Sequence, residues 1–393
     1  MKEIHGKIDE YLASKGMDRG ENTKKDGSSY FVAVGVGTIQ APLDNRGYIG
    51  SRVNAFNKAM LDAKAQMVEY LGTSIATETE KAYAEGDFAN PPPEAPESNP
   101  IADKLKALLV AKLDNALRAE GVDPSEKEAA AAAAKRVLAS EQYRKTISTM
   151  ARSEVVGMQV MCSFEGVPSG KKGQIGVVAI WSPKLGRMAA AMAGGGPLPG
   201  GVGKRPIKEQ IPSDKNVLLS TFGVQQKIDE NGNLVLVSFG QAGAASESPM
   251  AANAAYDKAR MNAMAALREF AGETVAVAAD SLQAESAQDY EDGSSDYEDQ
   301  SAFSQRIKAR ADAMNISGIA TVKRWEAKHP LTGRTVYGVV CSWSPQQAAR
   351  AQSMKRSMDA AASGAGAANA PKPVANPNGT IQGQGASADD DAF

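Results

Sequence analysis

Two segments with one pattern decide the fold of this chain: AFNKAMLDAKAQMVEYLG at Ala55–Gly72 and AYDKARMNAMAALREFAG at Ala255–Gly272. They align without a gap, and seven of the 18 aligned pairs are identical. A second pair follows in the same order, GVVAIWSP at Gly176–Pro183 and GVVCSWSP at Gly338–Pro345. Because two different elements recur in one order, the sequence indicates a duplicated domain.

Around these segments, each copy has the pattern strand, long helix, further helix, two-stranded hairpin and closing helix. The apolar positions of the long helix repeat at helical spacing, and its many alanines would let it lie close to a sheet. We therefore predict an α+β fold: two tandem copies of a small, mostly antiparallel sheet packed against Ala-rich helices, with the helices on one face. The expected elements are Tyr30–Ile39, Arg52–Thr79, Val155–Phe164, Gly176–Trp181 and Lys184–Ala193 in the first copy, and Asn233–Phe239, Ile319–Glu326, Val336–Trp343 and Gln346–Ala361 in the second.

Composition shifts set the expected domain limits. An N-terminal helix and loop (1–29) precede copy 1 (30–193), which carries a Pro-interrupted helical insertion at about 85–135. A Gly/Pro-rich linker (194–212) leads to copy 2 (213–362). The tail (363–393) is rich in Gly, Ala, Pro, Asn and Gln, and we expect it to be disordered because it cannot form a core.

The two copies are expected to differ at their beginnings. In copy 1, we predict that the polar run 20–29 is a loop. Copy 2 instead opens with a predicted hairpin, Val217–Ile228 and Asn233–Phe239, around Asn231-Gly232, a dipeptide typical of tight turns. Copy 1 has no such signal, so we interpret this hairpin and the helical insertion as unlike interaction surfaces.

Charge and cysteine content narrow the classes of partner. The net charge is −2, with acidic and basic residues interspersed, which disfavours nucleic acid as a partner. Cys162 and Cys341 do not occupy equivalent positions in the two copies, and we interpret them as half-buried strand thiols. No run reaches the roughly 18 apolar residues of a membrane span. As the sequence stands we expect a cytoplasmic protein, or an envelope or periplasmic one if a signal peptide has been removed.

No catalytic or metal-binding pattern stands out. The two histidines, His5 and His329, have no second ligand at zinc spacing. The acidic stretch 289–299 lacks the spacing of a calcium loop. Gly35-Val36-Gly37 resembles part of a nucleotide-binding turn, but strand glycines packed under the Ala-rich helix explain it better. We therefore expect a protein that is not an enzyme and has no cofactor.

Candidate interaction residues fall in two places. Trp181 and Trp343 occupy matching positions, and each could close its own core or contact another copy or subunit. The chain ends in Asp389-Asp390-Asp391-Ala392-Phe393. This tip is either solubilising or a docking segment, since an acidic tip with a terminal Phe after a Gly/Gln linker resembles the tails of single-stranded-DNA-binding proteins. That resemblance implies a partner with a pocket for Phe393 and basic residues for the carboxylates.

The order of strand, Ala-rich helix and hairpin also resembles small α+β domains of bacterial envelope proteins, namely surface lipoproteins and the flagellar H-ring assembly protein. The alanines at 55, 59, 63 and 65 with Gly72, their copies near 255–272, and the closing Trp-Ser-Pro segments carry this resemblance. It implies no catalytic residues. Our first hypothesis is a structural or assembly protein that self-associates, as a ring or filament subunit. The alternative is an adaptor that recruits partners through the acidic tip.

Overall fold

The computed structural model describes residues 4–85, 156–167, 172–194, 200–271 and 316–364, single residues between 113 and 137, and two short strands near the C-terminus. The first copy contains α1 (Ile4–Lys15), β1 (Gly20–Thr23), β2 (Ser29–Thr38), α2 (Tyr48–Glu85), β3 (Gln159–Gly166), β4 (Gln174–Trp181) and α6 (Pro183–Gly194). The second contains α7 (Ile207–Gln210), α8 (Lys215–Leu219), β5 (Gly223–Ile228), β6 (Leu234–Gly243), α9 (Pro249–Ala271), β7 (Ala320–Lys328), β8 (Thr335–Trp343) and α12 (Pro345–Gly364).

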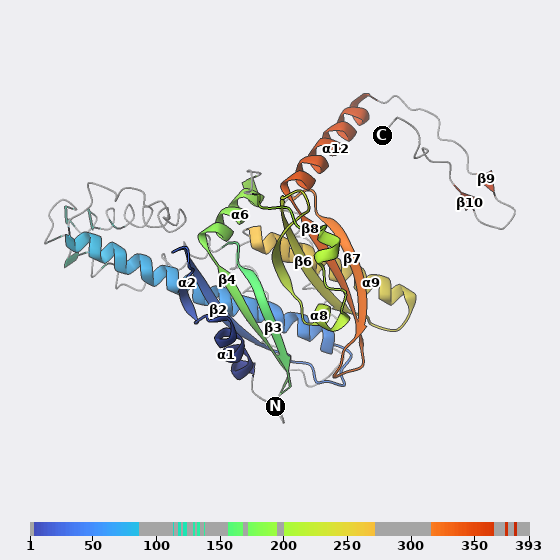
Figure 1. Ribbon diagram of the computed structural model, residues 1–393, viewed down its shortest axis with the longest axis horizontal. Coiled ribbons are helices and arrows are strands. Elements are labelled where there is room, and N and C mark those ends of the chain that lie inside the picture. Colours follow the sequence, from blue (N-terminus) through green and yellow to red (C-terminus); the bar gives the residue numbers. More distant parts are fainter. Residues whose placement is uncertain are drawn as a thin grey trace.

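The two copies form matching four-stranded antiparallel sheets, ordered β1-β2-β4-β3 and β5-β6-β8-β7 (Figure 1). Even an irregularity is repeated: the register shifts between Val160 and Cys162 in β3, and between Thr321 and Lys323 in β7. Since a bulge is a specific local feature, its recurrence at one place supports a common origin. The predicted α+β class and the duplication are confirmed.

A close approach of helix to sheet explains the glycines and alanines of the repeat. A Cβ atom added at Gly35 of β2 would lie 1.8 Å from the carbonyl oxygen of Ala59 in α2. A Cβ at Gly240 of β6 would lie 2.1 Å from the carbonyl oxygen of Ala259 in α9. Only glycine permits such contact with a backbone atom. The interpretation of Gly35 as a strand glycine under the Ala-rich helix is confirmed.

Helices cover both faces of the first sheet, so the prediction of helices on one face was wrong. α2 packs on one face, while Ile4, Ile8 and Leu12 of α1 form a separate core with Val32 and Val34 on the other. The reason lies in β2, where five successive residues from Phe31 to Gly35 are buried. A strand that is apolar on both sides needs cover on both sides.

The predicted difference at the start of the copies was also wrong. The run 20–29 is not a loop throughout, because β1 pairs with β2 from Gly20↔Val32 to Thr23↔Ser29. In copy 2, residues 215–219 are helix rather than strand, and the Asp214 side chain caps this helix by accepting from the Asn216 backbone N–H. Each copy therefore begins with a helix followed by a hairpin. The hairpin is common to both copies and does not distinguish one from the other.

Other predictions lie largely outside the described residues. These include most of the helical insertion, the acidic stretch 289–299 and most of the tail, in which β9 (Val374–Ala375) pairs with β10 (Ile381–Gln382). Four described residues of the insertion or next to it are buried in the core that contains α2: Leu113, Leu117, Ala133 and Val137. The linker contains α7. Within the described part of the chain, no helix is both long enough and apolar enough to cross a bilayer.

Candidate functional site

The two tryptophans lie in the core rather than on the surface. Trp181 ends β4 with 4% of its surface exposed, and Trp343 ends β8 with 2%. The indole N–H of Trp181 donates to the Val156 carbonyl at 2.8 Å, and that of Trp343 donates to the Ser317 carbonyl at 3.2 Å. The placement suits a role in closing the core, since buried indole needs such an acceptor. The other candidates, Asp389 to Asp391 and Phe393, lie outside the described residues.

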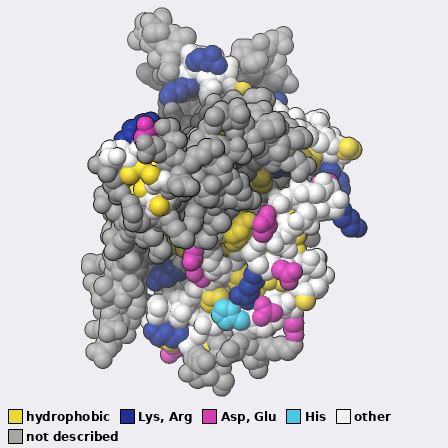
Figure 2. Space-filling model, turned by 90° about the vertical axis from the view of Figure 1, so that its left-hand side faces the viewer, with side chains coloured by type: hydrophobic (Ala, Val, Ile, Leu, Met, Phe, Trp, Pro, Cys, Tyr) yellow, Lys and Arg dark blue, Asp and Glu magenta, His cyan; other side chains and the backbone are white. Residues whose placement is uncertain are grey.

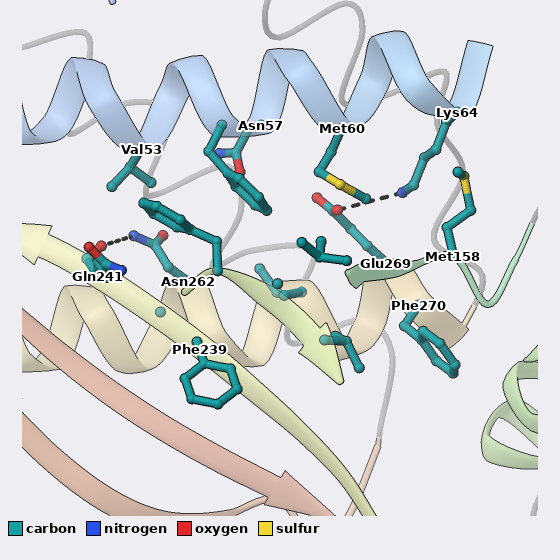
Figure 3. A pocket seen from close by; sticks show the side chains of 18 residues that line it. Val53, Asn57, Met60, Lys64, Met158, Phe239, Gln241, Asn262, Glu269 and Phe270 are labelled. Atoms are coloured by element: carbon teal, nitrogen blue, oxygen red, sulfur yellow. Dashed lines mark hydrogen bonds and ion pairs between the residues drawn. The ribbon is translucent and has the colours of Figure 1, made fainter. Parts of the chain in front are cut away.

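The contact between the copies joins β3 to β5, α2 to β6 and α6 to α9. Within it, α2 and α9 run in the same direction (Figure 3). Val53 of α2 lies near Asn262 of α9, and eleven residues further along Lys64 forms an ion pair with Glu269 at 3.6 Å. The two helices use different faces, because the repeat counterparts of Asn262 and Glu269 are Asp62 and Glu69, which remain exposed. The contact is therefore heterologous: each copy presents a different surface to the other.

A small cavity lies in this contact. It has a volume of about 50 Å³ and is lined mainly by apolar side chains from α2, α9, β3, β5 and β6. Such a volume holds a few water molecules at most. The Lys64–Glu269 pair contributes the charged groups of its lining. The cavity is thus too small for a cofactor.

A buried polar network ties the copies together next to that cavity. The guanidinium of Arg52, 2% exposed, donates from Nε to Glu165 Oε2 at 2.6 Å. Its Nη1 donates to Gln241 Oε1 at 2.7 Å, and its Nη2 donates to the Leu219 carbonyl at 2.6 Å. The Phe222 ring lies 4.7 Å from the guanidinium carbon. One arginine of copy 1 therefore connects β3 of its own copy with α8 and β6 of copy 2.

The Glu165 carboxylate receives two further contacts. The Tyr48 hydroxyl donates to Oε1 at 2.9 Å, and His329 Nε2 lies 3.1 Å from the same oxygen. Burial alone would raise the pKa of Glu165, but the His329 hydrogen bond and the Arg52 charge outweigh it and lower the pKa to about 2. Burial, together with the Glu165 charge, raises the pKa of Tyr48. Glu165 is accordingly ionised at neutral pH and fully engaged by its neighbours.

This network contains residue types that also occur in catalytic sites, but its side chains are enclosed by the protein. Tyr48, Arg52 and His329 are each at most 2% exposed. Each oxygen of Glu165 already accepts from a protein group. No cluster of three potential metal-ligating side chains exists among the described residues. Chemically, the arrangement holds the Arg52–Glu165 ion pair at the contact between the two copies.

We did not predict this network from the sequence, although one residue of the repeat signals it. Arg52 corresponds to Ala252 in the second copy. The two copies therefore differ at this position, just before the segment in which they are similar. A charged residue at the start of a helix is usually expected to be exposed to solvent. Its partners Glu165 and Gln241 lie 113 and 189 residues away along the chain, beyond the reach of local pattern reasoning.

The closing helices provide the clearest difference between the copies. In α6, an apolar stripe of Leu185, Met188, Ala189 and Met192 is buried in one core with α9 of the other copy. In α12, Met354 occupies the position of Met192 but is 67% exposed, and Met358 is 66% exposed. Figure 1 shows α12 projecting from the body of the molecule. The closing helix is thus packed against a core in copy 1, whereas in copy 2 it is mostly exposed beyond its first turn.

The charged side chains of the described residues show no single-sign patch on the face drawn in Figure 2, where acidic and basic groups are interspersed. This distribution agrees with the net charge of −2 and with the interspersed charges of the sequence. On that face, then, electrostatics do not mark a surface for a strongly charged partner.

Comparisons with known proteins bear on the fold alone. Residues 98–194, about a quarter of the chain, match a family described as a domain of unknown function (DUF6844). A crystal structure of the hypothetical protein FTT1539c from Francisella tularensis is similar, with a TM-score of 0.50 and 20% identity over 87% of this chain and 90% of that one. The comparison with curated proteins gives no match. Neither finding involves an envelope lipoprotein or a flagellar protein, so that resemblance stays a prediction.

Proposed function

We propose that this chain is a non-enzymatic assembly protein, a ring or filament subunit, that associates with further copies of itself through α12. One observation carries the proposal: α12 exposes two methionines four residues apart, Met354 and Met358, whereas α6 buries its own pair, Met188 and Met192. Exposed methionines on one helix suit an adaptable contact surface, because the unbranched side chain fits partners of varied shape.

Charge indicates where on a second copy α12 would bind. Its exposed residues include three basic ones, Arg350, Lys355 and Arg356. The exposed edge of α2 carries Asp62 and Glu69, at the positions that α9 uses within the molecule to contact the other copy. Opposite charges on the two surfaces favour a head-to-tail contact, which propagates into a ring or a filament rather than closing as a dimer.

The experiment is light scattering coupled to size-exclusion chromatography over a range of protein concentrations. We expect the mass of the wild-type protein to rise with concentration, and the double variant Met354→Glu/Met358→Glu to remain a monomer. Met250→Glu is the matched control, because Met250 is 82% exposed at the start of α9, away from α12. A wild-type protein that stays monomeric, or a double variant that assembles like the control, would contradict the proposal.

The second candidate, an adaptor that acts through Asp389–Phe393, rests on the composition of that tip. One experiment distinguishes the assembly function from the adaptor function. Deleting the last five residues would leave assembly through α12 intact and abolish capture of a partner, whereas the α12 double variant would do the reverse.

A further inference from the structure

A second depression, distinct from the cavity between α2 and α9, lies where the loops of the two copies meet. Its volume is about 320 Å³, which puts it at the lower end of small-molecule sites. Arg46, from the loop before α2, and Arg334, from the turn between β7 and β8, both line it. We call it the arginine pocket. No residue of the Arg52 network lines it.

Arg334 is held in place yet incompletely paired. Its Nη2 donates to the Asp44 carbonyl of the other copy, and its backbone N–H donates to Thr332 Oγ1. Its Nε is buried and has no hydrogen-bond partner among the described residues. A buried guanidinium nitrogen without an acceptor is costly, so the hydrogen bonds of Arg334 inside the protein leave it incompletely satisfied.

The surrounding charges favour an anion. Arg46 is exposed and forms no ion pair with a described residue. The one acidic side chain of the lining, Glu247, is also exposed. The lining of the pocket therefore carries two arginines and one carboxylate.

The walls add an apolar component. Ile49 and Tyr337, both buried, line the pocket along with the alanines of the loop between β6 and α9. From these features we propose that the arginine pocket binds a small organic anion, whose phosphate or carboxylate group lies between Arg46 and Arg334. Arginine is suited to both groups, because its planar fork can donate two parallel hydrogen bonds. The site requires both copies, since each contributes one of the arginines.

Isothermal titration calorimetry tests the proposal with two probes, inorganic phosphate and acetate, at an ionic strength kept constant with chloride. We expect saturable binding of at least one probe, and the tighter probe identifies the recognised group. Arg46→Gln and Arg334→Gln should each weaken binding at least tenfold, whereas Arg205→Gln, an exposed arginine elsewhere, should leave it unchanged.

Glu247→Gln keeps the test decisive if Arg334→Gln disturbs folding through the lost contact with Asp44. Removing this negative charge should tighten binding several-fold without touching the arginines. The proposal is overturned if neither probe binds saturably to the wild-type protein. It is equally overturned if Arg46→Gln and Glu247→Gln both bind as the wild type does.

Discussion

At the scale of single residues, the molecule places one charge pair where two copies of a fold meet. A buried ion pair has little net effect on stability when complete, but removal of one partner leaves a charge uncompensated. Arg52 and Glu165 fit this description, since every guanidinium nitrogen has an acceptor. Their counterparts Ala252 and Glu326 form no such pair, so the network belongs to the contact between the copies and not to the ancestral fold.

The pH dependence of stability follows from Glu165. Its pKa of about 2 lies below its ordinary 4.5, so the unfolded chain takes up the proton first as pH falls. The contribution of Glu165 is therefore fully present above pH 4.5 and is lost as pH falls towards 2. A difference of that size corresponds to roughly 3 kcal/mol.

We predict that Glu165→Gln lowers the free energy of unfolding at pH 7 by about 3 kcal/mol and flattens the acid loss between pH 4.5 and 2. Urea unfolding at pH 7 and pH 3 measures both effects. The control is Glu326→Gln, which changes the exposed counterpart in β7 and should stay within about 0.5 kcal/mol of the wild type. Equal losses in the two variants would refute the assigned role.

At the scale of elements, the sequence predicted the long helices, the central strands and the closing helices because each has a strong period. It failed at β1 and α8. The β1 sequence GENT has no apolar residue, and an edge strand of this kind forms only because β2 offers a partner. The five residues of α8 are too few to show a helical period, and Leu218 and Leu219 are buried by tertiary packing.

The close contact between each central strand and its long helix, at Gly35 and Gly240, predicts how substitution of these glycines affects stability. Gly35→Ala and Gly240→Ala should each destabilise the protein by at least about 2 kcal/mol, because the new methyl group meets helix backbone that cannot rotate away. Gly166→Ala is the control, since its methyl group would lie 3.4 Å from the flexible Ile4 side chain. Thermal unfolding followed by circular dichroism compares the three, and a Gly240→Ala protein as stable as the control would disprove the close approach.

At the scale of the whole molecule, the sequence predicted two tandem modules, but not how they would pack. The core that contains α2 also includes Phe222, Val237 and Val340 of the second copy, so hydrophobic residues of both copies form one cluster. The sequence could not show this, because the contact joins unlike faces. Val53 and Met60 are buried in it, while their counterparts Asn253 and Arg260 are exposed. Polar replacements of this kind are expected at the open end of a repeat.

A shared core predicts that the two copies unfold together. Hydrogen exchange with mass spectrometry, at increasing urea concentrations, follows β4 of copy 1 and β8 of copy 2 in one experiment. We expect peptides from Gln174–Trp181 and Thr335–Trp343 to lose protection at the same urea concentration and with the same slope. If one strand loses protection at a clearly lower concentration while the other remains protected, the copies are separate modules and the account of a merged duplication fails.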